Sequence, residues 1–247
     1  MRRGQTARWV AGAALAATGL LLPAARAGDG RTEIAPADFA ALPYTYTITQ
    51  PGSYVLTDTV RFTKELAHGI MVVADNVTLD LNGFALIGPG ANSGYGIFQP
   101  ATNRNLTVRN GSITGWKGVL YGGLQLDGFG NRAERVQVSE NYYGMTLGPG
   151  ALAKDCVACS NSLDGIRLDQ DSLLIGCRAA NNGSSGISAD DAGVLVDCEV
   201  RANAAGISAS WQSVVKGCVA EDNAGHGIFA GMGSVISMDV PPYVTVS

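Results

Sequence analysis

Three consecutive segments decide the fold: NSLDGIRLDQDSLLIGCRAAN at 161–181, NGSSGISADDAGVLVDCEVRA at 182–202, and NAAGISASWQSVVKGCVAED at 203–222. Each segment begins with an asparagine, has a Gly-Ile pair a few residues later and carries a cysteine near its end. Each is 20 or 21 residues long. Self-similarity at a fixed period of this length indicates a solenoid in which each repeat forms one coil.

The same spacing extends outward from these segments in three columns of residues. A glycine followed by an apolar residue recurs at 69, 96, 123, 144, 165, 186, 206 and 227. A second column consists of Cys156, Cys177, Cys198 and Cys218, with Val136 in the same role one repeat earlier. A third consists of Asn141, Asn161, Asn182, Asn203 and Asn223. The glycine column predicts about eight coils.

Within a repeat the apolar residues alternate, as at Ile166 and Leu168 and then at Leu173, Ile175 and Cys177, which is the period of a β-strand. Such a short repeat cannot bury its inner face alone, so the strands of successive coils must stack in parallel. We therefore expect an all-β parallel β-helix with these side chains inward. The asparagines would hydrogen-bond the next coil at a tight bend, where glycine supplies unusual backbone angles.

The stacked cysteines allow two interpretations. Adjacent coils lie about 4.8 Å apart, which is within the Cα range for a disulfide. Cysteine also acts as a small apolar filler of protein cores, and a uniform inward column explains the spacing without oxidation. We favour the filler interpretation.

The two ends of the chain differ from the repeats. Arg2, Arg3 and Arg8 precede an uncharged stretch that ends in Ala-Arg-Ala at 25–27, which is typical of a secretory signal peptide. The sequence predicts a signal peptide at 1–27, an N-terminal cap at 28–60, the β-helix at 61–235 and a C-terminal tail at 236–247. The apolar stretch is too short to span a bilayer, so no membrane span is expected. We expect a secreted or periplasmic protein.

Composition and charge exclude several classes of function. The 247 residues are 46% hydrophobic and 15% charged and include 33 glycines, so collagen-like and disordered chains are excluded. Removing residues 1–27 takes away four arginines and changes the net charge from −4 to −8. A nucleic-acid backbone would be repelled, and the remaining basic residues are scattered, so no nucleic-acid partner is expected. We expect a monomer.

Residues 47–235 resemble the right-handed parallel β-helix proteins typified by pectate lyases and other enzymes that act on polysaccharides. The resemblance rests on the Asn and Gly-Ile repeats, on ITQPGSYVL at 48–56 and on ADNVTLDLNGF at 74–84. It implies a right-handed coil, an N-terminal cap and a sugar-binding groove on the outside of one sheet. It implies polysaccharide as the partner.

One acidic patch stands out when residues are placed relative to the glycine column. Asp164, Arg167 and Asp169 share a coil, and Asp190 lies beside Asp169 on the next coil, about 4.8 Å away. Two such close carboxylates could share a proton for acid–base catalysis. Alternatively, Asp169 and Asp190 could hold Ca²⁺ together with Asp171 and Asp191. In a calcium-assisted lyase, Arg167 would hold or deprotonate the sugar.

Other candidate residues lie on neighbouring coils. Tyr95 and Tyr143 could support sugar rings. GHGI at 225–228, which contains His226, and NSLDGI at 161–166 resemble segments of polygalacturonases, which implies a catalytic role for His226 and Asp164. The match departs from that family because Asp164 and His226 are three coils apart and no Arg-Ile-Lys segment follows.

Two classes of function therefore remain open. The first is a polysaccharide-acting enzyme, either a calcium-assisted lyase or a glycoside hydrolase. The second is a noncatalytic module that binds carbohydrate or protein or serves as a surface element. Aspartates, asparagines and serines at bends often only hydrogen-bond local backbone, and an Asp–Arg–Asp face can be a solvated ion-pair cluster.

Overall fold

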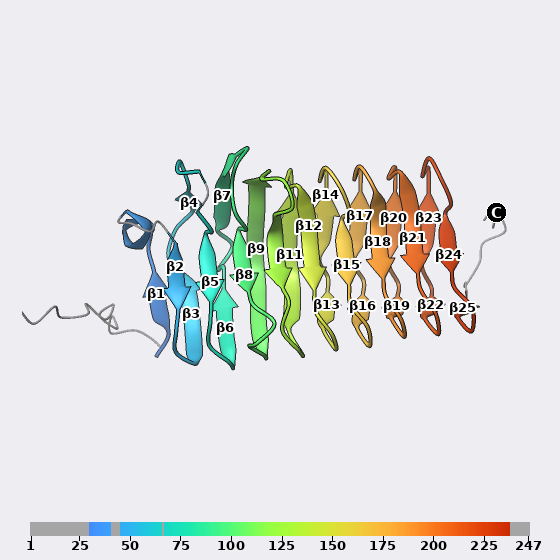
Figure 1. Cartoon of the computed structure of the whole chain (residues 1–247), viewed down its shortest axis with the longest axis horizontal. Helices are drawn as coiled ribbons and strands as arrows, with labels where there is room; N and C mark the ends of the chain where they lie inside the picture. Colours follow the sequence, from blue (N-terminus) through green and yellow to red (C-terminus); the bar gives the residue numbers. More distant parts are fainter. Residues whose placement is uncertain (1–29, 41–44, 66, 238–247) are drawn as a thin grey trace, which may run out of the picture.

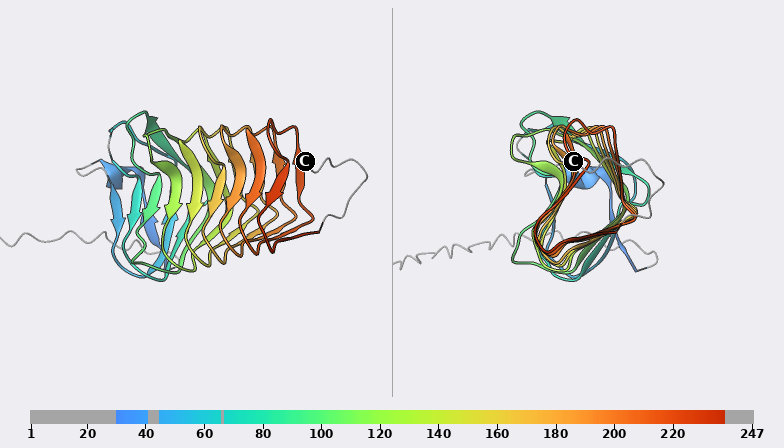
Figure 2. Two further views of the ribbon diagram at one scale, coloured as in Figure 1. Left: turned by 45° about the vertical axis from the view of Figure 1, so that its right-hand side comes forward. Right: turned by 90° about the vertical axis from the view of Figure 1, so that its right-hand side faces the viewer.

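The computed structural model describes residues 30–40, 45–65 and 67–237, and these residues form a parallel β-helix. The predicted signal peptide at 1–27 and most of the predicted tail lie outside the described residues. The strands lie side by side along the long axis (Figure 1), and the end-on view in Figure 2 shows successive coils superimposed. Among the described residues, no helix has the length and apolar character needed to span a membrane.

Every strand pair within the described ranges is parallel, as the repeats predicted. One sheet, here called the nine-stranded sheet, contains, in spatial order, β2 (Tyr46–Ile48), β5 (Ile70–Val72), β8 (Ile97–Gln99), β10 (Gly122–Leu126), β12 (Tyr143–Leu147), β15 (Ile166–Leu168), β18 (Ser185–Ala189), β21 (Ala205–Ala209) and β24 (Ile228–Ala230).

The other sheet, here called the sixteen-stranded sheet, bends around the rest of each coil. Its main path is β1 (Thr32–Ile34), β3 (Gly52–Leu56), β6 (Val77–Asp80), β9 (Leu106–Trp116), β11 (Arg132–Ser139), β13 (Leu152–Lys154), β16 (Leu173–Ile175), β19 (Val194–Val196), β22 (Val214–Lys216) and β25 (Val235–Ser237). Its remaining strands are β4 (Val60–Arg61), β7 (Ala85–Gly90), β14 (Val157–Cys159), β17 (Arg178–Ala180), β20 (Glu199–Arg201) and β23 (Val219–Glu221).

The coils begin earlier in the chain than the glycine column indicated. The strands β1, β2 and β3 of the expected cap segment pair with later strands, and a single 3₁₀ turn, η1 (Pro36–Phe39), lies between β1 and β2. The main path therefore has about ten turns in the described residues rather than the expected eight.

The core is a set of stacked apolar columns. Ile166, Ile187 and Ile207 follow one another inside the nine-stranded sheet and are fully buried. The four cysteines of the repeat column are buried free thiols, as expected for apolar filler. Hydrogen bonding to Cys156, together with burial, raises the pKa of Cys177, so this thiol stays protonated.

Bends change the direction of the side chains, which corrects two expectations. In the coils from 150 to 222, each coil has three bend residues with φ of 53–63°, spaced five residues apart, for example Asp171, Gly176 and Asn181. The backbone reversal at Gly176 makes Leu174 the buried residue, and Leu173 and Ile175, which were predicted inward, are only half-buried. Most of these bend residues are not glycines.

The repeated glycines instead make room for the asparagine amides. Gly165 has no positive φ, but a Cβ added there would lie 2.6 Å from Nδ2 of Asn182 and 2.7 Å from the carbonyl oxygen of Gly186. Such a contact is too short for a real side chain. The glycine column is therefore required by close packing against the next coil, and not by turn geometry.

The buried asparagines join the coils as predicted. Asn182 Oδ1 accepts the backbone N–H of Asn161 at 3.1 Å, and Asn182 Nδ2 donates to the carbonyl oxygen of Ala158 at 3.1 Å. The same pattern repeats between Asn182 and Asn203. We call this column the asparagine ladder. Because its members are buried, each amide satisfies backbone groups that water cannot reach.

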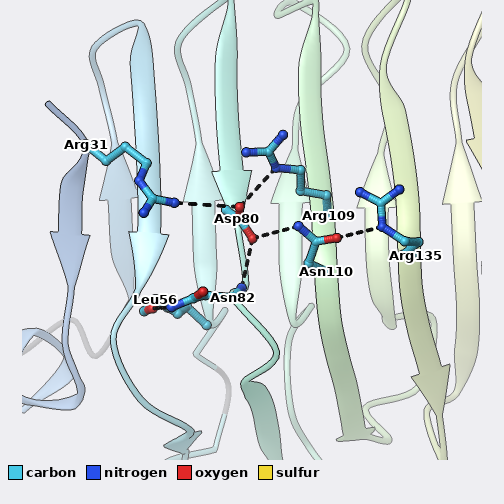
Figure 3. Close-up of polar contacts among 7 residues, drawn as sticks. All are labelled: Arg31, Leu56, Asp80, Asn82, Arg109, Asn110 and Arg135. Carbon is cyan, nitrogen blue, oxygen red and sulfur yellow. Dashed lines mark hydrogen bonds and ion pairs between the residues drawn. The ribbon is translucent and has the colours of Figure 1, made fainter. Parts of the chain in front are cut away.

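A polar cluster on the sixteen-stranded sheet fastens the N-terminal coils (Figure 3). Asp80, only 6% exposed, accepts the backbone N–H of Asn82 at 2.9 Å and the side-chain amide of Asn110 at 3.1 Å. It pairs with Arg109 at 3.1 Å and with Arg31 at 3.8 Å. Burial favours the neutral carboxyl group, but these hydrogen bonds and the charge of Arg109 outweigh it and lower the pKa of Asp80.

We predict that Asn182→Leu, which keeps the volume but removes the amide, lowers the free energy of unfolding by about 2–5 kcal/mol, since it leaves buried backbone groups without partners. Urea unfolding measures the loss. The control Ser162→Ala changes an exposed residue beside Asn161 and should cost less than about 0.5 kcal/mol. Equal stability of the two variants would contradict a supporting role for the ladder.

Asp80→Asn should lower stability by about 1–3 kcal/mol near neutral pH, because it removes a charge that holds two cations and two amide donors. A lowered carboxyl pKa stabilises the fold above the unfolded pKa and ceases to do so as pH falls through the folded value. The difference between wild type and variant should therefore shrink in acid.

The control for this prediction is Asp222→Asn, which alters an exposed ion pair with Arg201. It should change stability little at any pH. Thermal unfolding across pH compares the variants, and a pH-independent loss for Asp80→Asn would show that its charge is not what stabilises the coils.

Candidate functional site

The outward face of the nine-stranded sheet carries a groove of about 420 Å³. It lies across the coils that contain β10, β12, β15 and β18. Its polar and small lining residues come from equivalent places on successive coils: Ala101, Gln125, Asp127, Thr146, Gly148, Arg167, Asp169 and Asp190.

Strand register builds the groove from residues distant in sequence. Gln125 pairs with Thr146, Thr146 with Arg167, and Arg167 with Ser188. Their side chains point outward because the neighbouring residues in each strand are buried in the core. A second column, two residues further along each coil, contains Asp127, Gly148, Asp169 and Asp190. The sequence predicted the outward placement of Arg167, Asp169 and Asp190 in these columns.

Gly148 stands between two acidic residues of this column, one coil after Asp127 and one coil before Asp169. A Cβ at Gly148 would lie 2.5 Å from the backbone oxygen of Asp127, so backbone atoms occupy the place that a side chain would need. Close packing against the preceding coil therefore requires glycine here, and the column carries no side chain between the two aspartates.

The two carboxyl groups differ in environment. Burial raises the pKa of Asp127, a hydrogen bond from Gln125 opposes this effect, and the charge of Asp169 raises the pKa further. Asp169 Oδ1 accepts the backbone N–H of Gln170 at 2.7 Å, and Arg167 lines the groove on the same coil. Asp127 therefore keeps its proton at a higher pH than an ordinary aspartate does.

An aromatic cluster adjoins the groove on the preceding coils. The ring of Tyr95 stacks on Phe98 with centroids 5.0 Å apart and on His68 at 5.6 Å, and Tyr121 meets Tyr95 edge-on. Burial, with a smaller effect of Asp127, raises the pKa of Tyr95. His68 accepts the backbone N–H of Tyr95 at 3.0 Å, and burial lowers its pKa, so its ring is neutral.

A family described as "Right handed beta helix region" matches residues 102–239, more than half of the chain. The chain belongs to the right-handed β-helix family. None of the curated proteins matches it. Its β-helix is similar to that of the Dettilon tailspike protein, with 14% sequence identity and a TM-score of 0.56 over 71% of this chain.

The chain spans only 42% of the length of that tailspike chain. A second solved structure, the pectate lyase Pel9A, has 16% identity and a TM-score of 0.40, covering 82% of this chain and 71% of the lyase. At these identities the likeness to the tailspike shows the β-helix fold alone, so the chemistry has to be argued from the groove.

The β-helix brings together three of the predicted catalytic residues and separates two. Arg167, Asp169 and Asp190 line the groove. Asp164 does not line it, and its carboxylate accepts the backbone N–H of Ser185 at 3.0 Å, which is a structural contact between coils. His226 lies near the C-terminal end, with Nε2 3.0 Å from Ser208 Oγ.

The pairing of Asp164 with His226 that the polygalacturonase-like segments implied is not assembled. Asp164 and His226 occupy equivalent positions on coils that are three steps apart, or roughly 14 Å at 4.8 Å per step. At this distance the two side chains cannot both contact the same glycosidic bond.

The proposed calcium ligands do not converge. Among residues 30–40, 45–65 and 67–237, no three His, Cys, Asp or Glu side chains form a group that could hold a metal ion. Asp191 Oδ1 accepts the backbone N–H of Trp211 at 3.1 Å, and Asp171 lies at a bend with φ of 58°. The donor set does not fit Ca²⁺, so no step through a metal is derived.

The two predicted tyrosines have different surroundings. Tyr95 belongs to the aromatic cluster beside the groove, whereas Tyr143 packs edge-on against Tyr142 at 5.3 Å. Sequence reasoning missed Asp127 and Tyr121. Asp127 occupies the same column as Asp169 and Asp190, so its position was a usable signal, but its burial was not visible in the sequence.

Proposed function

We propose that this β-helix protein binds polysaccharide in the groove and hydrolyses a glycosidic bond there, with Asp127 as general acid and Asp169 as general base. The observation that carries the proposal is the raised pKa of Asp127 in the same groove as Asp169, with only Gly148 between them in the column. Two carboxyl groups in different environments can take opposite roles at one pH.

The backbone spacing of the two residues is nearer to the carboxyl separation of inverting glycosidases than to the roughly 5–5.5 Å of retaining ones. The two residues are two coil steps apart, or about 10 Å at roughly 4.8 Å per step. Inverting glycosidases hold their carboxyl groups about 6.5–9.5 Å apart, which leaves room for a water molecule. Here Asp127 would give its proton to the departing glycosidic oxygen, while Asp169 takes a proton from the water that attacks the anomeric carbon.

The neighbouring residues have supporting roles in this proposal. Arg167, which lines the groove on the same coil as Asp169, would donate hydrogen bonds to sugar hydroxyl groups. The aromatic cluster around Tyr95 offers ring faces next to the acid. We further propose that residues 1–27 direct export, so that the protein meets polysaccharide outside the cytoplasm as a monomer.

A noncatalytic carbohydrate-binding role is the second candidate. One observation favours it: in the coils that follow 143, the strands are joined by short bends, and these bends add no long loop to wall the groove. An open groove binds a chain without excluding water from the bond to be cleaved.

A panel of neutral and acidic polysaccharides separates the candidates. Release of reducing ends without ultraviolet-absorbing unsaturated products would indicate hydrolysis, unsaturated products would indicate a lyase, and binding without either would indicate a binding module. Proton NMR of the first product reports whether the anomeric configuration is inverted.

We predict that Asp127→Asn and Asp169→Asn each lower kcat by about 10²–10⁴-fold, the usual contribution of a general acid or base. In the wild type, kcat/KM should fall as pH rises through the raised pKa of Asp127, because only the protonated form donates. Asp127→Asn should lack this alkaline limb. The exposed control Asp222→Asn should keep wild-type kinetics, and full activity in both groove variants would refute the assignment.

A further inference from the structure

A row of bend residues runs across the coils next to the groove columns, and we call it the rim. Each rim residue lies one or two positions after the second groove column and precedes a bend residue of positive φ. Backbone hydrogen bonds from that bend residue to the rim residue of the next coil align the row. Its members are Phe129, Pro149, Gln170, Asp191, Trp211 and Met232.

Two rim residues expose large aromatic rings. Phe129 is 64% exposed and Trp211 is 60% exposed, whereas Trp116 is fully buried in the core. Each exposed ring lies over a glycine of the next coil. A Cβ at Gly150 would be 2.9 Å from the ring of Phe129, and one at Gly231 would be 2.7 Å from Trp211 Cδ1.

The glycines explain how the rings are held. A side chain at either position would collide with the ring, so each ring rests directly on backbone and keeps its other side open to solvent. The bend that carries Trp211 is also tied to the preceding coil, because its N–H donates to Asp191 Oδ1 at 3.1 Å. A ring supported in this way loses little conformational entropy when a ligand stacks on it.

The two rings lie four coils apart on the rim. Phe129 follows β10, and Trp211 follows β21, one coil beyond the last groove-lining residue, Asp190. Four steps of about 4.8 Å separate them by roughly 19 Å along the solenoid axis. Asp169, Asp190 and the polar rim residues lie between them. The site would thus have an aromatic ring at each end and polar side chains between them. Its length exceeds that of one or two sugar rings.

The charge of the surface restricts the ligand. Among the described residues of the groove and rim, the carboxyl groups of Asp127, Asp169, Asp190 and Asp191 are accompanied by a single guanidinium group, that of Arg167. A polymer of uronic acids would bring further negative charge to this surface.

We propose that Phe129 and Trp211 are the two terminal stacking subsites of one elongated site, which binds a neutral oligosaccharide of several units along the solenoid axis. This proposal rests on the proposed function of the groove. It adds the direction of the bound chain, its minimum length and its neutral class.

The test measures binding of neutral oligosaccharides of graded length, from the xylose, glucose and mannose series, and of oligogalacturonates as the acidic comparison. Calorimetry gives the affinity, and tryptophan fluorescence reports on Trp211, because Trp116 is buried and Trp9 belongs to the predicted signal peptide. If the wild type cleaves a ligand, Asp169→Asn serves as the background for every variant.

We expect affinity for one neutral series to rise with length until the ligand reaches both rings. Trp211→Ala and Phe129→Ala should each weaken binding of the long members about 3- to 10-fold, the usual value of one aromatic contact, and flatten the length dependence. Trp211→Phe should retain most of the affinity but lose the fluorescence change. The control Val119→Ala, at an exposed residue away from the rim, should bind like the wild type.

Three outcomes would overturn the inference. If the wild type binds oligosaccharides and both alanine variants bind equally well at every length, the rings are not subsites. If oligogalacturonates bind more tightly than neutral chains, the ligand class is wrong. If the wild type binds no glycan at all, the proposed function fails along with the inference, whereas normal ring-dependent binding without cleavage removes only the hydrolytic assignment.

Discussion

Hydrogen bonds between the buried amides of successive coils hold this β-helix in register, and its outer surface depends on that register. Each ladder asparagine satisfies a backbone N–H and a backbone carbonyl group of the coil before it, as Asn182 does for Asn161 and Ala158. The adjacent glycine is required because the amide leaves no room for a side chain. A shift by one residue would break these contacts and turn the outward columns inward.

The groove follows from the same stacking. Residues about 21 positions apart become neighbours, so Asp127, Gly148 and Asp169 follow one another in a single column. Partial burial raises the pKa of the first carboxyl group, while the second lines the groove on the same coil as Arg167. The rim adds two exposed aromatic rings, and the number of coil steps between them sets their separation. The proposed acid–base pair and the proposed elongated binding surface thus both rest on columns along one sheet.

The sequence predicted the parallel coils, the asparagine ladder and the outward columns because each is a strict repeat. It did not predict which bend residue reverses the backbone, so Leu173 and Ile175 were placed inward instead of Leu174. The four calcium ligands were proposed from their spacing alone. In the structure the Asp191 carboxylate instead accepts the backbone N–H of Trp211. Asp127 was missed because the effect of burial on a carboxyl group depends on packing, which no repeat encodes.

Cysteine cross-linking tests the register of the outward face most directly. Ser188 and Ser208 are direct partners on adjacent strands, so Ser188→Cys with Ser208→Cys should form a disulfide that peptide mapping detects, since the Cα atoms lie about 4.8 Å apart. Thr146→Cys with Ser188→Cys spans two coils, or roughly 10 Å, and should not cross-link. A disulfide in the second pair, or none in the first, would contradict the stacking from which the groove and rim are built.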